Sequence, residues 1–332
     1  MVGGSKSAVY AALFGNMAIA VSKLVAALFT GSTSMWAETY HSFSDTLNQI
    51  LLLIGIRTSK KRVSERHPFG YGKEQFFWSF IVSILIFGIS GFISLERGIV
   101  SLLDLQLHQQ IENMTINYVI LAISSIFEAN ALRIAFFSFK KTIEGRGDRL
   151  TFSSLIGEFK ESKDTSVLTV LVEDTSALIG ITVAALALFL TEVTDNRFFD
   201  SIGSIMIGFI LMAFAVFLAR ENKELLIGES ISRRDYRRIN AIISKIPEVN
   251  RIISIRSMYL APEDVLIAIE VSLVDNLDTD SIESVIDNIE NKVREIIPYA
   301  DPSKIYVEPE RDSSVSSSSI KNRYHQHLRK WD

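Results

Sequence analysis

The chain of 332 residues is 48% hydrophobic and carries a formal net charge of −4. It contains no cysteine, which excludes disulfides, thiolate metal sites and cysteine nucleophiles. The small negative charge, without a basic cluster interleaved with aromatic residues, gives no indication of a nucleic-acid partner. The apolar bias points instead to a membrane protein.

Six apolar segments reach about the 20 residues that a helix needs to cross a bilayer. They cover residues 8–30, 32–57, 76–103, 116–139, 167–191 and 198–220. We therefore expect a bundle of six transmembrane helices over residues 5–221. Lys23 lies near the end of the first segment, and we expect its long side chain to snorkel to the membrane surface rather than to have a direct role, which is the alternative.

Basic residues are unevenly distributed among the connections between these segments. The connections 58–74 and 140–164 are rich in lysine and arginine, whereas 104–115 has none and 192–197 has one. By the positive-inside rule the rich connections, and with them both chain ends, lie in the cytoplasm. The sequence thus predicts a multi-pass protein of the cell membrane.

The second segment is unusual because it carries Glu38, His41, Asp45 and Asn48 in its first two-thirds. His41 and Asp45 are four residues apart and project from one face, with Asn48 a further turn along. Ionisable groups in a bilayer cost at least ~2.5–3.5 kcal/mol each on insertion scales, so they normally face a pathway or a partner. An imidazole and a carboxylate at this spacing form half of a divalent-metal site. The alternative is a buried polar pair that holds helices together.

Charged residues also occur in the later segments. Glu96 with Arg97, and Glu128 with Arg133, either form structural pairs, which we expect, or lie near the membrane interface. In the fifth segment Glu173 and Asp174 are adjacent, which places them ~100° apart around a helix. One of the two is expected to face the bundle centre, and the other a neighbouring helix or a polar cavity.

Residues 222–310 have the pattern of a small α+β domain with the order αββαβ. Ser232 is expected to cap a helix at 233–246, followed by strands at 251–259 and 264–273, a helix at 279–297 and a strand at 304–308. We expect a three-stranded sheet with both helices on one face. The serine-rich tail 311–332 is expected to be disordered, with its two histidines solvated.

Together, these six helices, the αββαβ domain and the H-x-x-x-D spacing resemble the cation diffusion facilitator family of metal efflux transporters over residues 5–310. The most specific motif is HPFGYGK at 67–73. The GSTSMWAE entry to the second segment, Asp200 and the LLIGES sequence after the sixth segment are also similar. The EDTSA sequence at 173–177 resembles the zinc-transporter-nine-like branch.

In that family the transported ion lies between helices two and five, held by two residues four apart on each helix. Carried over, the resemblance implies that His41, Asp45 and Asp174 bind the metal and that Val170 stands at the fourth position, where it cannot be a ligand. The remaining ligand is then one of four candidates: Asn48, Glu173, Thr169 or water. Imidazole with carboxylates favours zinc, and added amide or water oxygens admit manganese, iron or cobalt.

The resemblance implies metal/proton antiport by a homodimer that joins through its cytoplasmic domain, with no enzymatic activity and no cofactor besides the transported ion. His67, in the HPFGYGK motif, either binds metal or braces its loop. Two other functions remain open. One is a non-transporting membrane scaffold or metal sensor that acts through the cytoplasmic domain. The other is an intramembrane metal hydrolase, although no HExxH motif is present.

Overall fold

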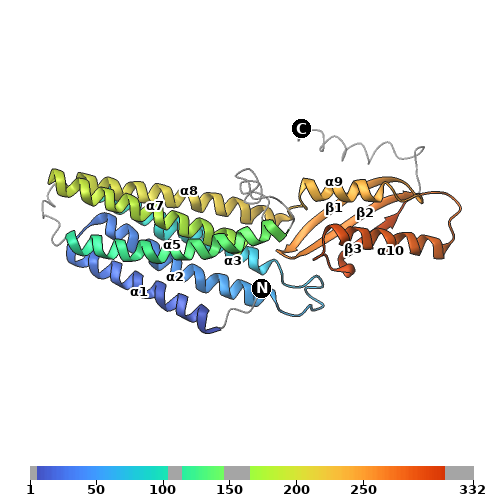
Figure 1. Cartoon of the computed structure of the whole chain (residues 1–332), viewed down its shortest axis with the longest axis horizontal. Helices are drawn as coiled ribbons and strands as arrows, with labels where there is room; N and C mark the ends of the chain where they lie inside the picture. Colours follow the sequence, from blue (N-terminus) through green and yellow to red (C-terminus); the bar gives the residue numbers. More distant parts are fainter. Residues whose placement is uncertain (1–5, 104–113, 146–164, 311–332) are drawn as a thin grey trace. The chain divides into compact units, whose positions relative to one another are not determined.

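The computed structural model describes residues 6–103, 114–145 and 165–310 (Figure 1). The helices are α1 (Lys6–Thr30), α2 (Thr33–Ser59), α3 (Glu74–Leu85), the π-helix η1 (Ile86–Phe92), α4 (Ile93–Leu103), α5 (Met114–Gly145), α7 (Thr165–Thr194), α8 (Phe198–Ile227), α9 (Arg233–Ile243), α10 (Thr279–Ile296) and the short η2 (Pro302–Lys304). The strands are β1 (Val249–Ala261), β2 (Asp264–Leu273) and β3 (Ile305–Pro309). The expectation of a disordered tail at 311–332 falls outside the described residues.

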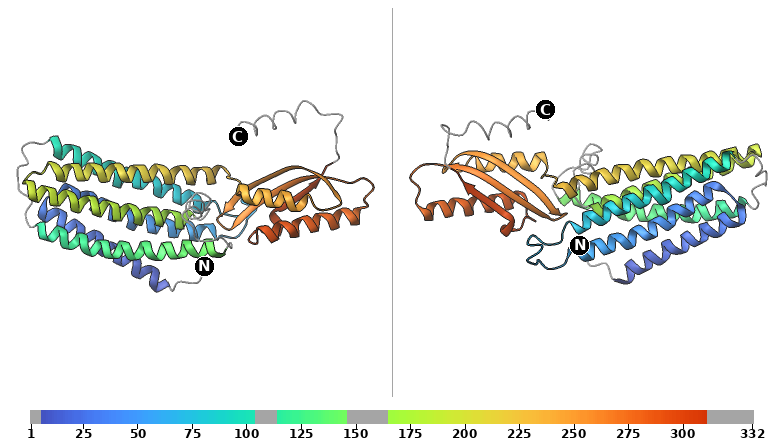
Figure 2. Two further views of the ribbon diagram at one scale, coloured as in Figure 1. Left: turned by 45° about the horizontal axis from the view of Figure 1, so that its top comes forward. Right: turned by 180° about the vertical axis from the view of Figure 1, so that it is seen from behind.

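All six apolar segments form helices, and five of them meet the length and composition of a membrane span. Within the described ranges these are Leu13–Thr30, Glu74–Leu103, Met114–Phe137, Leu168–Thr194 and Phe198–Ile227. Helix α2 is not among them, because its polar residues lower its hydropathy. It nevertheless packs against α1, α3, α7 and α8 inside the bundle (Figure 2). That α2 is a sixth span stays a prediction.

The third segment is one continuous helical rod with a π-helical middle. This rod, α3–η1–α4, packs closely on α8 because glycines bring the two backbones together. A Cβ atom on Gly208 would lie 2.7 Å from the Leu95 nitrogen, and one on Gly98 would lie 2.9 Å from the Ile205 nitrogen. Any side chain at either position would force the helices apart.

Two apolar clusters fill the helical bundle. One includes Met35, Ala37, Ile181 and Leu188. The other comprises seven buried side chains, Leu52, Val82, Ile86, Leu168, Val172, Ala215 and Leu218. On α2 and on α7, the polar residues identified from the sequence lie between the residues that belong to the two clusters. The apolar clusters therefore bracket a polar layer in the middle of the bundle.

The second compact unit begins at Glu229. Gly228 caps the C-terminus of α8; its φ of 126° is a conformation that favours glycine, and its N–H donates to the Glu224 carbonyl. The predicted order αββαβ is confirmed, with sheet order β1-β2-β3 and β2 parallel to β3. As predicted, Ser232 caps α9 by accepting from the Asp235 N–H at 3.1 Å.

Alternation along β2 gives this unit its core. Four side chains of β2 are at most 1% exposed: Val265, Ile267, Ile269 and Val271. The apolar faces of the two helices are buried too, at Ile239 and Ile243 of α9 and at Val285, Ile289 and Val293 of α10. Helix α10 contacts both α9 and β3, which agrees with helices that share one face of the sheet.

Candidate metal site in the helical bundle

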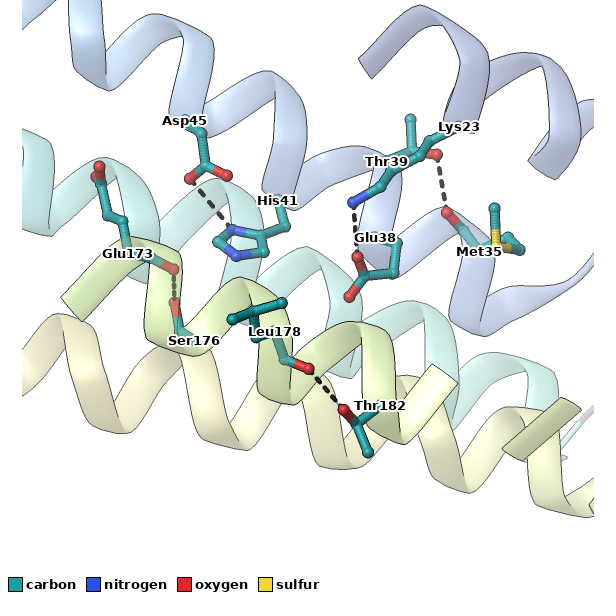
Figure 3. A network of polar contacts seen from close by, with 10 residues as sticks. All are labelled: Lys23, Met35, Glu38, Thr39, His41, Asp45, Glu173, Ser176, Leu178 and Thr182. Carbon is teal, nitrogen blue, oxygen red and sulfur yellow. Dashed lines mark hydrogen bonds and ion pairs between the residues drawn. The ribbon is translucent and has the colours of Figure 1, made fainter. Parts of the chain in front are cut away.

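His41 and Asp45 lie side by side on α2, as their spacing predicts. The His41 Nδ1 is 3.3 Å from the Asp45 Oδ1, and the two side chains are 1% and 13% exposed (Figure 3). Among the described residues neither nitrogen of His41, nor that Asp45 oxygen, has a hydrogen-bond partner. Buried polar atoms are normally hydrogen-bonded. A buried imidazole and carboxylate with unused lone pairs are suited to accept a metal cation.

Helix α7 presents two carboxylates toward this part of α2, and they differ in their contacts. Glu173 is buried and accepts a hydrogen bond from the Asn48 amide at 2.7 Å. Asp174 is half-buried, and its buried Oδ2 has no hydrogen-bond partner in the described part of the chain. It interacts electrostatically with Asp45 and His41. Asp174 is therefore the α7 carboxylate with a buried oxygen that has no partner among the described residues.

The three predicted ligands are not assembled into a closed site. Over residues 6–103, 114–145 and 165–310, no three histidine or carboxylate side chains lie close enough to hold one ion. The Asn48 amide, a candidate fourth ligand, is bonded to Glu173, although its carbonyl oxygen has no partner among these residues. Val170 is half-buried one turn before Asp174. The ligand set of His41, Asp45 and Asp174 stays a prediction.

His67 does not belong to this layer. It follows the end of α2, which runs 18 residues or roughly 27 Å beyond His41. His67 is exposed and forms a backbone bridge with Ser64, and its ring packs on Tyr71 with centroids 4.3 Å apart. These contacts fit a loop brace, and they leave its metal role untested.

Sequence reasoning missed a buried ion pair next to His41. The expectation that Lys23 snorkels is wrong, because its side chain is fully buried and its Nζ lies 2.8 Å from the Glu38 Oε2 (Figure 3). The Glu38 carboxylate on α2 therefore holds the Lys23 ammonium of α1 inside the bundle. Glu38 precedes His41 by three residues, and this spacing was the signal in the sequence that could have indicated the pair.

Glu128 on α5 was also misassigned as the partner of Arg133. Its carboxylate interacts electrostatically with Asp45, Lys23 and His41, whereas the Arg133 guanidinium lies 5.7 Å from the Phe137 ring centroid. Glu128 is half-buried. It therefore adds a further acidic group to the polar layer, contributed by a third helix.

Arg97 likewise has partners on another helix rather than Glu96. Its guanidinium lies 4.1 Å from the ring centroid of Trp36 and donates to the Tyr40 hydroxyl at 3.0 Å. A cation over an aromatic face is favourable, the more so when water is excluded. This contact ties α4 to the first turns of α2.

Asp200 on α8 caps the N-terminus of α2. Its carboxylate accepts from the Ser32 hydroxyl at 2.8 Å, from the Thr33 N–H at 2.6 Å and from the Ser34 N–H at 3.2 Å. The hydroxyls of Thr33 and Ser34 also donate to it. Because the first N–H groups of a helix lack partners, a carboxylate there stabilises the helix start. The start of the helix that carries His41 and Asp45 is thus held in place.

The fold and this layer define a class of protein: a multi-pass membrane protein whose helical bundle buries an imidazole and several carboxylates, followed by a small α+β unit. The chain belongs to the cation efflux family. Residues 9–227 match the cation efflux transmembrane domain. Residues 231–310 match the cytoplasmic domain of cation efflux proteins, ZT_dimer.

Similar proteins include known transporters. The mitochondrial proton-coupled zinc antiporter SLC30A9 of Xenopus laevis is 33% identical over 276 residues, which is 82% of this chain and 48% of that protein. Metal tolerance protein C4 of Arabidopsis thaliana is 29% identical over 258 residues, 78% of this chain and 55% of the relative. Magnetosome protein MamM of Paramagnetospirillum magneticum is 33% identical over 105 residues, 32% of this chain and 33% of the relative. The chain spans about half the length of the first two relatives.

Proposed function

We propose that this protein exports a divalent metal cation in exchange for protons. Zinc is the first candidate, and manganese, iron and cobalt are the alternatives. The observation that carries the proposal is the buried His41–Asp45 pair, 3.3 Å apart, with unused lone pairs on both side chains. Membership of the cation efflux family supports it, as does similarity to a protein named a proton-coupled zinc antiporter.

The proposed ligands are His41 and Asp45 of α2 and Asp174 of α7. A cation between the two helices would be neutralised by the carboxylates and bound by the imidazole, a donor set that suits zinc. Metal binding requires deprotonated ligands, so protons leave these groups when the cation arrives and return when it departs. One set of side chains then serves both halves of the exchange.

The exchange is also reasonable in energy. A divalent cation that leaves an inside-negative compartment climbs ~4.6 kcal/mol per 100 mV, twice the figure for one charge, and each entering proton recovers about half of that. A histidine near its neutral-pH transition makes proton exchange practical. Rocking of helices would open the polar layer alternately to the two sides of the membrane.

The proposal includes a location and an assembly. The helical bundle lies in the cell membrane with both chain ends in the cytoplasm, because the positively charged connections then face inward. Two chains associate through residues 231–310, which match ZT_dimer, the cytoplasmic domain of cation efflux proteins. These points rest on charge distribution and family membership.

Reconstitution tests the function directly. Purified full-length protein in liposomes with an internal pH-sensitive dye and an internal zinc indicator should couple inward zinc movement to outward proton movement. Glu96→Gln, which removes an exposed carboxylate on α4 that is not a proposed ligand, is the matched control and should keep the exchange. A protein that is folded and inserted but carries no zinc, manganese, iron or cobalt would contradict transport and favour the scaffold or sensor alternative.

A further inference from the structure

The Lys23–Glu38 ion pair joins α1 to α2 inside the helical bundle. Both side chains are 0% exposed, and the Nζ–Oε2 distance is 2.8 Å. A buried ion pair is a weak source of stability, because desolvation of the two charges offsets their attraction. Ionisable residues within a membrane bundle therefore indicate a functional site.

Glu38 uses only one of its two oxygens for Lys23. The other, Oε1, is buried and has no hydrogen-bond partner among the described residues. It points to α7, where a Cβ atom on Gly180 would come within 2.5 Å of it. Glycine at this position leaves the space that the free oxygen occupies.

Glu38 also shares a helix face with His41. The two residues are three apart on α2, and Figure 3 shows both side chains projecting from α2 toward α7. Neither His41 nitrogen has a hydrogen-bond partner in the described part of the chain. A glutamate and a histidine at this spacing are a known metal-binding pair on the inward faces of helical bundles.

We propose that Glu38 and His41 form a second divalent-cation position on α2, displaced from Asp45 toward the N-terminal end of the helix. When no divalent cation is bound there, the Lys23 ammonium pairs with the Glu38 carboxylate. The idea rests on the proposed transport function and adds a second station to it. His41 is common to both stations, because it lies between Asp45 and Glu38 along the same face.

Exchange of two cations on one carboxylate has a direct consequence for transport. A metal ion that moves from Asp45 to Glu38 displaces the ammonium, and the returning ammonium displaces the metal ion. Glu38 therefore always has a cation partner, whereas the displaced Lys23 ammonium is left as an unpaired buried charge, which is costly and drives its return. Lys23 limits how long the cation stays and so keeps the second station weak.

The test measures zinc binding to purified full-length protein by calorimetry, in an Asp45→Ala background that weakens the first station. Adding Lys23→Met should increase zinc affinity at least tenfold, because the carboxylate loses its competing ammonium. Adding Glu38→Gln as well should abolish the gain. An affinity that Lys23→Met leaves unchanged, or a gain that survives Glu38→Gln, would overturn the proposal.

A further variant avoids a lone buried charge and covers the case in which Lys23→Met does not fold. Gly180→Ala keeps both Lys23 and Glu38 but displaces the free carboxylate oxygen from α7. It should lower zinc turnover at least threefold in liposomes while zinc binding that depends on Asp45 is retained. Unchanged turnover in a folded Gly180→Ala protein would count against the second station.

The two proposals fail in different ways. If the unmodified protein moves no metal, transport is wrong, while the calorimetric comparison of Lys23→Met with Lys23→Met/Glu38→Gln still decides the Glu38 station. If the unmodified protein moves zinc and Glu38→Gln leaves both binding and turnover unchanged, only the second station is wrong.

Discussion

The Asn48 amide of α2 donates to the Glu173 carboxylate of α7 across 2.7 Å. Asn48 lies one turn beyond Asp45 on α2, and its acceptor, Glu173, is the first of two adjacent carboxylates on α7. Its neighbour Asp174 keeps a buried oxygen without a partner among the described residues. The two carboxylates therefore differ in their contacts: Glu173 joins the two helices, and Asp174 keeps the buried oxygen that our proposal assigns to the cation.

Replacement of Asp174 should abolish transport without unfolding the protein. Asp174→Ala removes one of the three proposed ligands and one of two negative charges facing the cation, and we expect at least a hundredfold loss of zinc-coupled proton flux in liposomes. Glu173→Gln, which keeps an oxygen for the Asn48 amide, should lose less than tenfold. Normal flux in Asp174→Ala would mean that the site is assigned wrongly.

The valine at position 170 offers a test of selectivity. Val170→His would place an imidazole one turn from Asp174 and supply a fourth protein ligand. Because four nitrogen and oxygen ligands in tetrahedral reach favour zinc over manganese, zinc affinity relative to manganese should rise about tenfold in competition calorimetry. An unchanged ratio would show that this half-buried side chain does not face the ion. Val170→Leu is the apolar control.

Asp200 should be important for stability. Asp200→Ala leaves the hydroxyls and N–H groups at the start of α2 without their buried acceptor, and each such loss costs ~1–3 kcal/mol. We expect the free energy of unfolding in mixed micelles to fall by about 3 kcal/mol or more. Asp200→Asn keeps one acceptor oxygen, so its free energy of unfolding should fall by less. Equal unfolding midpoints for Asp200→Ala and the parent protein would contradict the capping role.

A pH dependence is expected in the second unit at the start of α10. Hydrogen bonds from Ser281 lower the pKa of Asp278 below its ordinary value of 3.8, because they favour the charged form. The carboxylate thus stabilises the unit above its ordinary pKa, and this stabilisation disappears as the pH falls through the lowered pKa. In urea unfolding of residues 229–310, Asp278→Asn should be less stable than the parent near pH 6, and the difference should shrink as the pH falls below 3.8. A constant difference would exclude Asp278 as its source.

The same fragment tests the assembly. Within this fragment, residues 229–259 and 263–310 belong to one compact unit with its own apolar core. Residues 231–310 match the ZT_dimer cytoplasmic domain of cation efflux proteins. Sedimentation equilibrium should therefore show a monomer–dimer transition as concentration rises. A strict monomer at high micromolar concentration would show that the association, if the full chain has one, comes from the helical bundle.

Local pattern determined much of this protein. The apolar segments predicted most ends of the bundle helices to within a few residues. Alternation of apolar residues predicted β2, and a 3.6-residue period predicted α10. The spacing of His41 and Asp45 put them on one face of α2. Each of these results depends on the geometry of one helix or strand, which neighbouring residues specify.

Pairing between helices was decided only by the tertiary structure. Lys23 was expected at the membrane surface and is buried against Glu38, while Arg97 contacts Trp36 and Tyr40 rather than its neighbour in sequence. The cap that Asp200 provides joins residues more than 160 positions apart. A charged residue within an apolar bundle must find an opposite charge or a hydrogen-bonding group wherever packing brings one. Which partner that is depends on how the helices pack, and no period within a single helix contains that information.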